Sequence, residues 1–411
     1  MQNEKELIPH LFRREFSKMV TVISKLFGLQ HIEVAEDIVS ETFLIATETW
    51  GMKGIPPNPT AWLYAVAKNK TLEYLRRDKV FAEKVGPALA LAENTNIQSI
   101  TLDFSSQNIN DSQLQMLFAI CDPIIPAEAQ IGLALRILCG FGIDEIAEAF
   151  LSNKETINKR LYRAREKLRE TKVKLEMPGE QEVSARLDNV LHAIYLLFNE
   201  GYYSTTQNKI LRQDMCVEAL RLGVMLAGYG KTNLPQTNAL IALMCFHASR
   251  FNARQDSNDV VVLYADQDEA LWDKELIRQG NRYLNISAKG SVISSYHLEA
   301  AIAQLHSKKD DTTEKWEAIL QLYNRLLQIN YSPAVAVNRT FALYKARGAA
   351  EAIIEAEKLP AQNNHFYFTL LGELYKDIDT MHAKAQYQKA YALAKTEKEK
   401  SVLSLKIKAI K

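Results

Sequence analysis

The sequence predicts an all-α protein with more than one domain. Helical periodicity of apolar residues runs through most of its 411 residues, whereas alternation of apolar and polar residues bounded by turns is rare. The run VVVLYADQD at 260–268 is the only stretch with a strand-like pattern. At about 100 to 200 residues per domain, this length suggests two to four domains.

The composition is that of a chain that folds in a reducing compartment. Hydrophobic residues make up 47% and charged residues 24%, with 16 Gly and 11 Pro, which excludes the disordered and collagen-like classes. We expect a soluble, cytoplasmic protein, because no run of about 18 apolar residues and no secretory signal is present. Four widely spaced cysteines without a C-x-x-C pair predict reduced core thiols and no metal site: Cys121, Cys139, Cys216 and Cys245.

Breaks in the periodicity divide the chain into blocks of different charge. Gly, Pro and polar residues gather at four places: 51–60, 86–112, 176–182 and 228–236. The net charge is only +1, but residues 28–49 hold five acidic residues and no Lys or Arg, whereas residues 154–174 hold nine Lys or Arg and three Glu. The balanced total therefore does not exclude a nucleic-acid partner.

Residues 28–49 predict an amphipathic helix with an acidic outer face. At about 100° per residue, its apolar side consists of Ala35, Ile38, Val39, Thr42, Phe43 and Ala46. The opposite side carries Glu33, Asp37, Ser40, Glu41 and Glu48. A solvated helix face would explain this charge, but no Lys or Arg stands at i+3 or i+4 to compensate it. That absence favours a face that binds another protein.

The next helix, NPTAWLYAVAKNKTLEYLRRDK at 58–79, mixes aromatic and basic residues after Pro59, at a place where proline is tolerated. Basic side chains neutralise phosphates and aromatic rings stack on unpaired bases, so the segment suits single-stranded or opened DNA. Alternatively, Trp62 and Leu63 belong to the core and the basic residues form a solubilising rim. The pattern alone does not choose between these interpretations.

Residues 142–170 predict two helices joined by a tight turn, with the spacing of a helix-turn-helix motif. Asn153 suits the N-cap of the second helix, whose buried stripe consists of Ile157, Leu161, Ala164 and Leu168. The other side carries Thr156, Lys159, Arg163 and Lys167, and this basic stripe can enter a DNA major groove. An ordinary helix pair would share the packing pattern, so DNA binding is the favoured interpretation and not the sole one.

In this order, the acidic helix AEDIVSETF, the basic and aromatic helix and the helix-turn-helix resemble RNA polymerase sigma factors of the extracytoplasmic-function (ECF) group. More narrowly, HLFRREF, CDPIIPAEAQIGLALRILCGF, YLLFNEGYYS and ADQDEALWD resemble the subgroup with a C-terminal tetratricopeptide-like (TPR-like) extension. The resemblance implies four segments: a sigma region 2 domain at 1–80, a flexible linker at 81–112, a region 4 helix-turn-helix domain at 113–175, and a TPR-like helical extension at 180–411.

The resemblance also assigns roles to residues that the patterns single out, with core RNA polymerase (its β′ clamp helices and β flap) and promoter DNA as partners. The residues that would dock on the β′ clamp helices are Glu36, Asp37 and Glu41. Those that would recognise and help open the minus-10 element are Trp62, Tyr64, Lys68, Asn69, Tyr74, Arg76 and Arg77. Those that would read the minus-35 element in the major groove are Lys154, Glu155, Thr156, Asn158, Lys159, Arg160 and Arg163. No cofactor and no catalytic residue is implied.

The sequence departs from the family pattern at two places. Gly142 stands where Ser or Thr commonly caps the first helix of the motif, which weakens that helix start by roughly a few tenths of a kcal/mol. The D-Q-D-R pattern of the family ends here in Glu269 instead of Arg. A regulatory site and a plain helix cap remain equal interpretations of its first three residues, Asp266, Gln267 and Asp268.

The second half of the chain contains weak repeats. One helix pair is outlined by Tyr323, Asn338, Ala342, Gly348 and Ala352, and another by Leu371, Gly372, Tyr375, Ala385, Tyr387 and Ala390. Ala352 and Ala385 stand 33 residues apart, close to the roughly 34-residue tetratricopeptide period. Such an array would present a concave surface to a peptide or protein, or fold back on the sigma domains. We expect it to regulate activity in cis.

Two other functions fit parts of the sequence. A stand-alone helix-turn-helix regulator with a repeat domain as a sensor would bind duplex DNA by itself, without requiring the acidic or the aromatic helix. An enzyme fits less well, because no P-loop, G-x-S-x-G, H-E-x-x-H or dinucleotide fingerprint is present. Histidines such as His247 and His306 suit ordinary structural roles. We therefore predict a sigma factor and not an enzyme.

Overall fold

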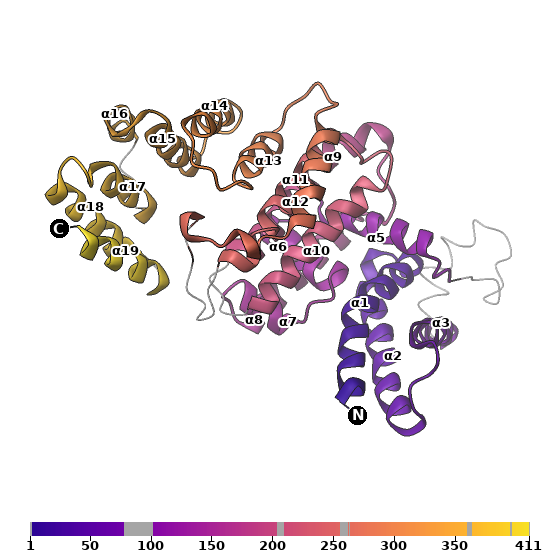
Figure 1. Ribbon diagram of the computed structural model, residues 1–411. Helices are drawn as coiled ribbons and strands as arrows, with labels where there is room; N and C mark the ends of the chain where they lie inside the picture. Colours follow the sequence, from indigo (N-terminus) through magenta and orange to yellow (C-terminus); the bar gives the residue numbers. More distant parts are fainter. Residues whose placement is uncertain are drawn as a thin grey trace. The chain divides into compact units, whose positions relative to one another are not determined.

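The computed structural model describes residues 2–77, 102–203, 209–254, 262, 264–359, 364–394 and 397–410. Every regular element in these ranges is helical, which confirms the predicted all-α class (Figure 1). Within the strand-like run, Tyr264–Asp266 forms a 3₁₀ turn (η6). The chain divides into two compact units, unit 1 at Met1–Thr232 and unit 2 at Asn233–Lys411. Among the described helices, none combines the length and the apolar character needed to cross a bilayer.

Unit 1 begins with three packed helices, α1 (Gln2–Phe27), α2 (Ile32–Lys53) and α3 (Pro59–Arg77), with the 3₁₀ turn η1 (Leu29–His31) between the first two. The apolar side of α2 is buried as its periodicity predicts. Gly54 ends α2 with a φ of 83°, a backbone conformation that glycine adopts readily. The side chain of Asn58 accepts a hydrogen bond from the Ala61 N–H at the start of α3.

The middle of unit 1 contains α5 (Ser106–Ile120), α6 (Ala127–Leu133), the π-helical turn η4 (Ala134–Leu138), α7 (Ile143–Ala149) and α8 (Lys154–Glu170). Ser105 caps α5 by accepting a hydrogen bond from the Asn108 N–H, so the helix starts at residue 106 and not at 113 as expected. Residues 106–112 of the expected flexible linker are therefore helical, and α5 packs against α1. Linker residues 81–101 lie outside the described ranges.

Two further helices, α9 (Glu180–Tyr203) and α10 (Lys209–Ala227), also belong to unit 1, although the sequence assigns them to the extension. Helix α9 packs against α5 and α6, and α10 packs against α5 and α7. Arg186 of α9 donates to the Phe118 carbonyl at 2.8 Å, and Arg221 of α10 donates to the Leu138 carbonyl at 2.8 Å. The first helices of the expected extension therefore complete the core that the sigma-like segments share.

Unit 2 opens with α11 (Pro235–Ala248), followed by the 3₁₀ turns η5 (Phe251–Arg254), η6 and η7 (Glu269–Leu271), and by α12 (Lys274–Ser287) and α13 (Ser295–Leu305). Helix α11 is buried along most of its length and packs against both α12 and α13. Gly280 of α12 lies against the ring of Phe246 of α11. The small residue allows the two helices to approach closely.

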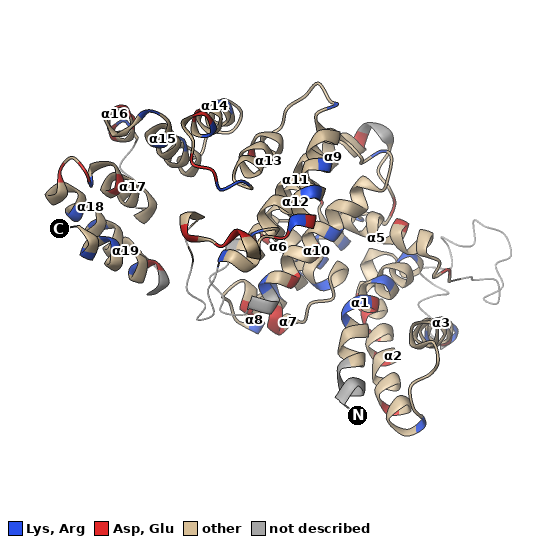
Figure 2. Ribbon diagram, viewed as in Figure 1, with Lys and Arg blue, Asp and Glu red and all other residues tan. Residues whose placement is uncertain are grey.

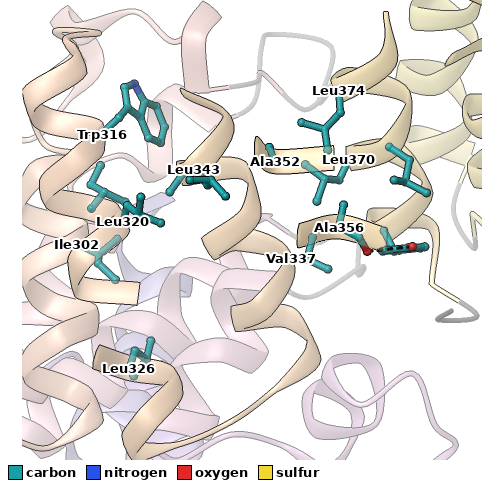
Figure 3. Packing of buried hydrophobic residues seen from close by; sticks show 14 of the residues in the cluster. Ile302, Trp316, Leu320, Leu326, Val337, Leu343, Ala352, Ala356, Leu370 and Leu374 are labelled. Atoms are coloured by element: carbon teal, nitrogen blue, oxygen red, sulfur yellow. Dashed lines mark hydrogen bonds between the residues drawn. The ribbon is translucent and has the colours of Figure 1, made fainter. Parts of the chain in front are cut away.

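The rest of unit 2 is a series of helices in which each packs against the next: α14 (Thr313–Ile329), α15 (Pro333–Arg347), α16 (Ala349–Glu357), α17 (His365–Tyr375), α18 (Thr380–Leu393) and α19 (Glu397–Ala409). Apolar side chains of α13 to α17 form one continuous core (Figure 3). Helices α15, α17 and α19 begin at residues 333, 365 and 397, an interval of 32 residues.

The prediction that Ala385 packs in the second helix pair of the repeats is wrong. Helix α18 begins at Thr380, and its buried side contains Ala383, Tyr387 and Ala390. Ala385 lies on the other side of this helix and is exposed. Gly372 of α17 does lie against the Tyr387 ring, as a close helix pair requires. The packing of α17 on α18 therefore agrees with the predicted pair, with a different alanine in the contact.

Candidate functional site

The outer face of α2 is exposed and carries both acidic and apolar side chains. Asp37 and Glu41 lie on this face, and the Glu41 carboxylate accepts a hydrogen bond from Lys70 Nζ of α3 at 2.5 Å. Leu44, one turn further along, is 59% exposed. Leu44 was not among the predicted binding residues, although its spacing of three residues from Glu41 places it on the same face. The exposed face, named the α2 stripe below, consists of Asp37, Ser40, Glu41, Leu44, Thr47 and Glu48.

Glu36 lies away from this stripe, although it was predicted to act with Asp37 and Glu41. Its side chain is only 8% exposed. Oε1 accepts a hydrogen bond from Arg136 Nε of η4 at 3.0 Å, and Oε2 lies 2.8 Å from Arg165 Nη2 of α8. The sequence shows no compensating cation at i+3 or i+4, but the fold supplies two arginines from distant elements.

The aromatic side chains of α3 pack within unit 1. The Trp62 ring lies 5.3 Å from that of Trp50, centroid to centroid, with an edge-to-face arrangement. The Tyr64 ring stacks on Phe104 at 4.7 Å, and its hydroxyl donates to Glu15 Oε2 at 2.6 Å. Burial, followed by the hydrogen bond to Glu15, raises the pKa of Tyr64. These rings therefore occupy packed positions, as does Tyr74, whose ring lies edge-on to Phe27.

The polar residues of α3 differ in accessibility. Asn69 and Arg76 are exposed, and Lys68 is half-buried. Arg77 is the last residue of α3, and its side chain lies outside the described residues. The structure thus leaves Asn69 and Arg76 as the predicted minus-10 residues that are open to solvent.

The two helices expected at 142–170 are present as α7 and α8, and the second has the cap that the sequence predicts. Asn153 Oδ1 accepts a hydrogen bond from the Thr156 N–H at 2.8 Å, and the predicted stripe of α8 is buried. At the start of α7 the Gly142 N–H donates to Glu145 Oε2 at 2.8 Å. Glu145 therefore satisfies one backbone donor there, and the helix begins despite the missing capping side chain.

The outer face of α8 presents most of the predicted minus-35 residues to solvent: Lys154, Glu155, Thr156, Asn158, Lys159 and Arg163. Arg160 is an exception, because its guanidinium pairs with Glu128 at 3.1 Å and lies over the Phe150 ring. Tyr162, which was not among the predicted DNA-binding residues, is 64% exposed on the same helix. In Figure 2 the positions of Lys and Arg are coloured blue and those of Asp and Glu red on the ribbon of α7 and α8. Lys154 and Lys159 form exposed ion pairs with Asp144 and Glu155. Such pairs contribute only about 0 to 1 kcal/mol, so another partner can replace them.

The D-Q-D-E segment of unit 2 occupies helix ends. Asp268 Oδ1 accepts a hydrogen bond from the Ala270 N–H at 2.9 Å and caps η7, and Asp266 ends η6. Gln267 is buried, and its backbone carbonyl oxygen accepts a hydrogen bond from Lys309 Nζ at 2.6 Å. The positions of Asp266 and Asp268 at helix ends agree with the interpretation that this segment caps helices. A regulatory role of Asp266, Gln267 and Asp268 stays a prediction.

The His, Cys, Asp and Glu side chains of the described part of the chain bear on metal binding and on thiol reactivity. No group of three or more His, Cys, Asp or Glu side chains there could hold a metal ion. The four cysteines are free and buried. Burial raises the pKa of the Cys121 and Cys245 thiols to about 12, so they stay protonated at neutral pH.

Comparison with known proteins shows that the amino-terminal helices are similar to a known protein family. Residues 11–80, which include most of α1 and all of α2 and α3, match the family described as sigma-70 region 2. Residues 186–288 match a family of unknown function, DUF6596. The uncharacterized protein R00370 of Rhizobium meliloti (strain 1021) is 30% identical over 383 residues, which cover 92% of this chain and 90% of the relative. No solved structure matches the chain.

The match to region 2 supports a member of the sigma-70 class of transcription initiation factors, which are not enzymes. Core RNA polymerase and promoter DNA are the partners of that class. More particularly, the chain belongs to the family of R00370, since their similarity extends over nearly the whole of both proteins.

Proposed function

We propose that the chain is a sigma factor of the ECF type, which binds core RNA polymerase, recognises the minus-35 and minus-10 promoter elements and promotes initiation, with a TPR-like extension that regulates it. The α2 stripe is the observation that carries this proposal. An exposed leucine among carboxylates is the arrangement of a protein-binding surface, since an apolar anchor within a polar rim provides most of the energy at such interfaces.

The stripe defines the partner surface by its chemistry. Asp37, Glu41 and Glu48 require a basic surface, and Leu44 requires an apolar pocket within it. The β′ clamp helices of core polymerase are the proposed surface. Lys70 neutralises Glu41 only partly, because this contact is exposed to water, and a basic partner can replace it.

Promoter contacts are proposed for α8 and α3. On α8, Lys154, Lys159 and Arg163 suit phosphates or guanine edges, and Asn158 suits adenine. On α3, Asn69 and Arg76 are the exposed candidates for the minus-10 element. Trp62 and Tyr64 would first have to leave Trp50 and Glu15 before their rings could stack on unpaired bases.

The extension is proposed to act in cis and in the cytoplasm, where core polymerase is found. The 32-residue interval between α15, α17 and α19, and the packing of each helix on its neighbours, support a TPR-like array. Its partner is a peptide or protein, or the sigma part of the same chain.

A run-off transcription assay with bacterial core polymerase and a genomic fragment library tests the proposal. The wild type is compared with an Asp37→Lys, Glu41→Lys double variant, and with a Glu314→Lys, Glu351→Lys variant that makes the same charge change on exposed positions of unit 2. We expect promoter-specific transcripts that the α2 variant loses and the control keeps. Duplex binding without core-dependent initiation would refute the proposal and favour the stand-alone regulator.

A further inference from the structure

Unit 2 contains a buried arginine without a counter-charge, and we infer that this arginine belongs to a binding site for a phosphate group. Arg250 lies between α11 and η5 and is 9% exposed. Among the described residues, no carboxylate pairs with its guanidinium, and Nε has no hydrogen-bond partner. The inference concerns unit 2 alone, so it does not depend on the proposed function.

The surroundings of the Arg250 guanidinium do not balance its charge. An arginine side chain stays protonated in proteins, and burial removes the hydration that stabilises the charged form. The Arg250 Cζ atom lies 5.4 Å from the centroid of the Tyr264 ring of η6. The attraction between a ring and a cation is much weaker than the hydration that burial removes. A bound anion would supply the missing compensation, because charge-assisted hydrogen bonds are the strong ones.

A second buried cation, Lys315 of α14, lies beside the same ring. Its side chain is 4% exposed, and Nζ lies 5.6 Å from the Tyr264 centroid. Nζ donates to the Tyr264 hydroxyl at 3.2 Å and to the backbone carbonyls of Lys308 and Asp310 at 2.5 and 2.7 Å. The Asp310 carboxylate lies 3.8 Å from Nζ, but it is 50% exposed, so water screens much of its charge. Two cations therefore flank Tyr264, and Asp310 offsets one of them only in part.

A histidine beside these cations is held in its neutral form. The His306 ring lies 5.1 Å from the Tyr264 ring and 5.6 Å from that of Trp316, edge-on to both. Trp316 belongs to the core of α13 to α17 (Figure 3). Burial, followed by the charges of Arg250 and Lys315, lowers the pKa of His306 to about 3. The electrostatic potential at this cluster is thus positive enough to oppose a further cation, which agrees with a site for an anion.

An unpaired indole N–H lies beside the same ring. Trp272 follows η7 and is 3% exposed, and its Nε1 has no hydrogen-bond partner within the described part of the chain. Its ring stacks on that of Tyr264, with centroids 6.2 Å apart. The Asp273 N–H donates to the Ser249 carbonyl at 2.8 Å, which holds Trp272 beside the segment of Arg250. Two buried donors therefore reach Tyr264 from adjacent segments, and a ligand with several acceptor oxygens could pair with both.

The chemistry of these groups favours phosphate. The guanidinium of Arg250 and the ammonium of Lys315 both suit phosphate oxygens, and the indole N–H of Trp272 donates only. A phosphate monoester carries about 1.5 to 2 negative charges at neutral pH, which match two cations better than the single charge of a carboxylate does. The contacts involve the anion alone, so inorganic phosphate and a phosphorylated small molecule share the chemistry of this site.

Isothermal titration calorimetry of the full chain with inorganic phosphate, at constant ionic strength, tests the inference. Arg250→Met removes the charge, and Arg278→Met makes the same change at an exposed position of α12 as the matched control. We expect saturable binding by the wild type and by Arg278→Met. The Kd of Arg250→Met should be at least about tenfold higher, because a hydrogen bond to a charged group contributes roughly that factor.

Thermal unfolding gives a second measurement and a second variant. Trp272→Phe keeps an aromatic ring and loses the indole N–H, so it should bind phosphate about fivefold more weakly, as expected for one hydrogen bond. It decides the outcome if Arg250→Met does not fold. Phosphate should raise the unfolding temperature of the wild type and Arg278→Met more than that of either site variant. The site variants also measure the general stabilisation that phosphate gives by exclusion from protein surfaces.

Glycerol 3-phosphate and acetate, titrated in parallel, identify the source of the anion. Tighter binding of glycerol 3-phosphate than of inorganic phosphate would support a phosphorylated small molecule as the ligand, and the reverse order would support free phosphate. Binding of acetate as tight as that of phosphate would overturn the assignment to phosphate. The site itself would be overturned by a wild type without saturable phosphate binding, or by equal Kd values in the wild type and in the site variants that fold.

Discussion

Replacement of Gly280 by alanine should destabilise unit 2, because α11 and α12 approach each other at this glycine. A Cβ atom at position 280 would lie 2.7 to 2.9 Å from three carbons of the Phe246 ring. Phe246 is fully buried, so its ring has no free space to move into. Either the ring or the helix must shift, and the packing of α11 on α12 loosens.

Two opposing effects set the magnitude. Overpacking a well-packed core by an added carbon costs about 1 to 3 kcal/mol. Removing a glycine from a helix interior gains about 0.5 to 1 kcal/mol. The two ranges leave a net loss of roughly 0 to 2.5 kcal/mol, with midpoints that give about 1 kcal/mol. For a unit of this size each kcal/mol lowers Tm by about 2 to 4 °C.

Thermal unfolding of the full chain followed by circular dichroism measures this shift. Gly51→Ala is the control, since Gly51 also lies within a helix, α2, but has no atom within 4 Å of the added Cβ. The control should keep or slightly raise the Tm of unit 1. A Gly280→Ala protein that melts at or above the wild-type temperature would refute the close approach of α11 and α12.

Three further predictions concern the α2 stripe, the unit boundary and a buried histidine. Leu44→Ala should weaken core polymerase binding about tenfold, about 1.4 kcal/mol, without changing the Tm, because Leu44 is exposed; an unchanged titration of labelled core would contradict this. A fragment ending at residue 232 should unfold cooperatively, whereas one ending at 179 should lose cooperativity and protease resistance, because it lacks α9 and α10. Burial, followed by the charges of Arg250 and Lys315, lowers the pKa of His306 to about 3. The unfolded chain then binds the proton first, so unit 2 should lose stability as pH falls from about 6.5 towards 3. Urea titrations at pH 7 and 5 should show a smaller difference for His306→Gln, and an equal difference would contradict the assignment.

The local periodicity of apolar residues was enough to predict where the helices lie and which of their faces are buried. The buried stripe of α8 and the cap at Asn153 follow from neighbouring residues alone, and the structure confirms both. The apolar side of α2 was predictable for the same reason. Contacts between distant segments were not, since Arg136 reaches Glu36 from 100 residues further along the chain. Glu36 was therefore grouped with its exposed neighbours, although the fold buries it.

The expected break after α8 illustrates a second limit of the sequence. The stretch EMPGEQE at 176–182 has the composition of a linker, but Pro178 is buried and α9 returns to pack on α5 and α6. Composition shows that the helix ends there; it does not show where the next helix packs. For the same reason the sequence does not show which helices cover the buried positions of α9, such as Leu187 and Leu197.

The boundary at Thr232 also bears on how such proteins can be recombined. The segment 186–288 that matches a family of unknown function begins in unit 1 and ends in unit 2, so the sequence family and the folding unit do not coincide. A chimera joined at residue 186 would give a foreign α9 and α10 to the core around α5 and α7, with mismatched apolar surfaces. A junction just after Thr232 keeps that core native, so it is the position at which one second unit could be exchanged for another.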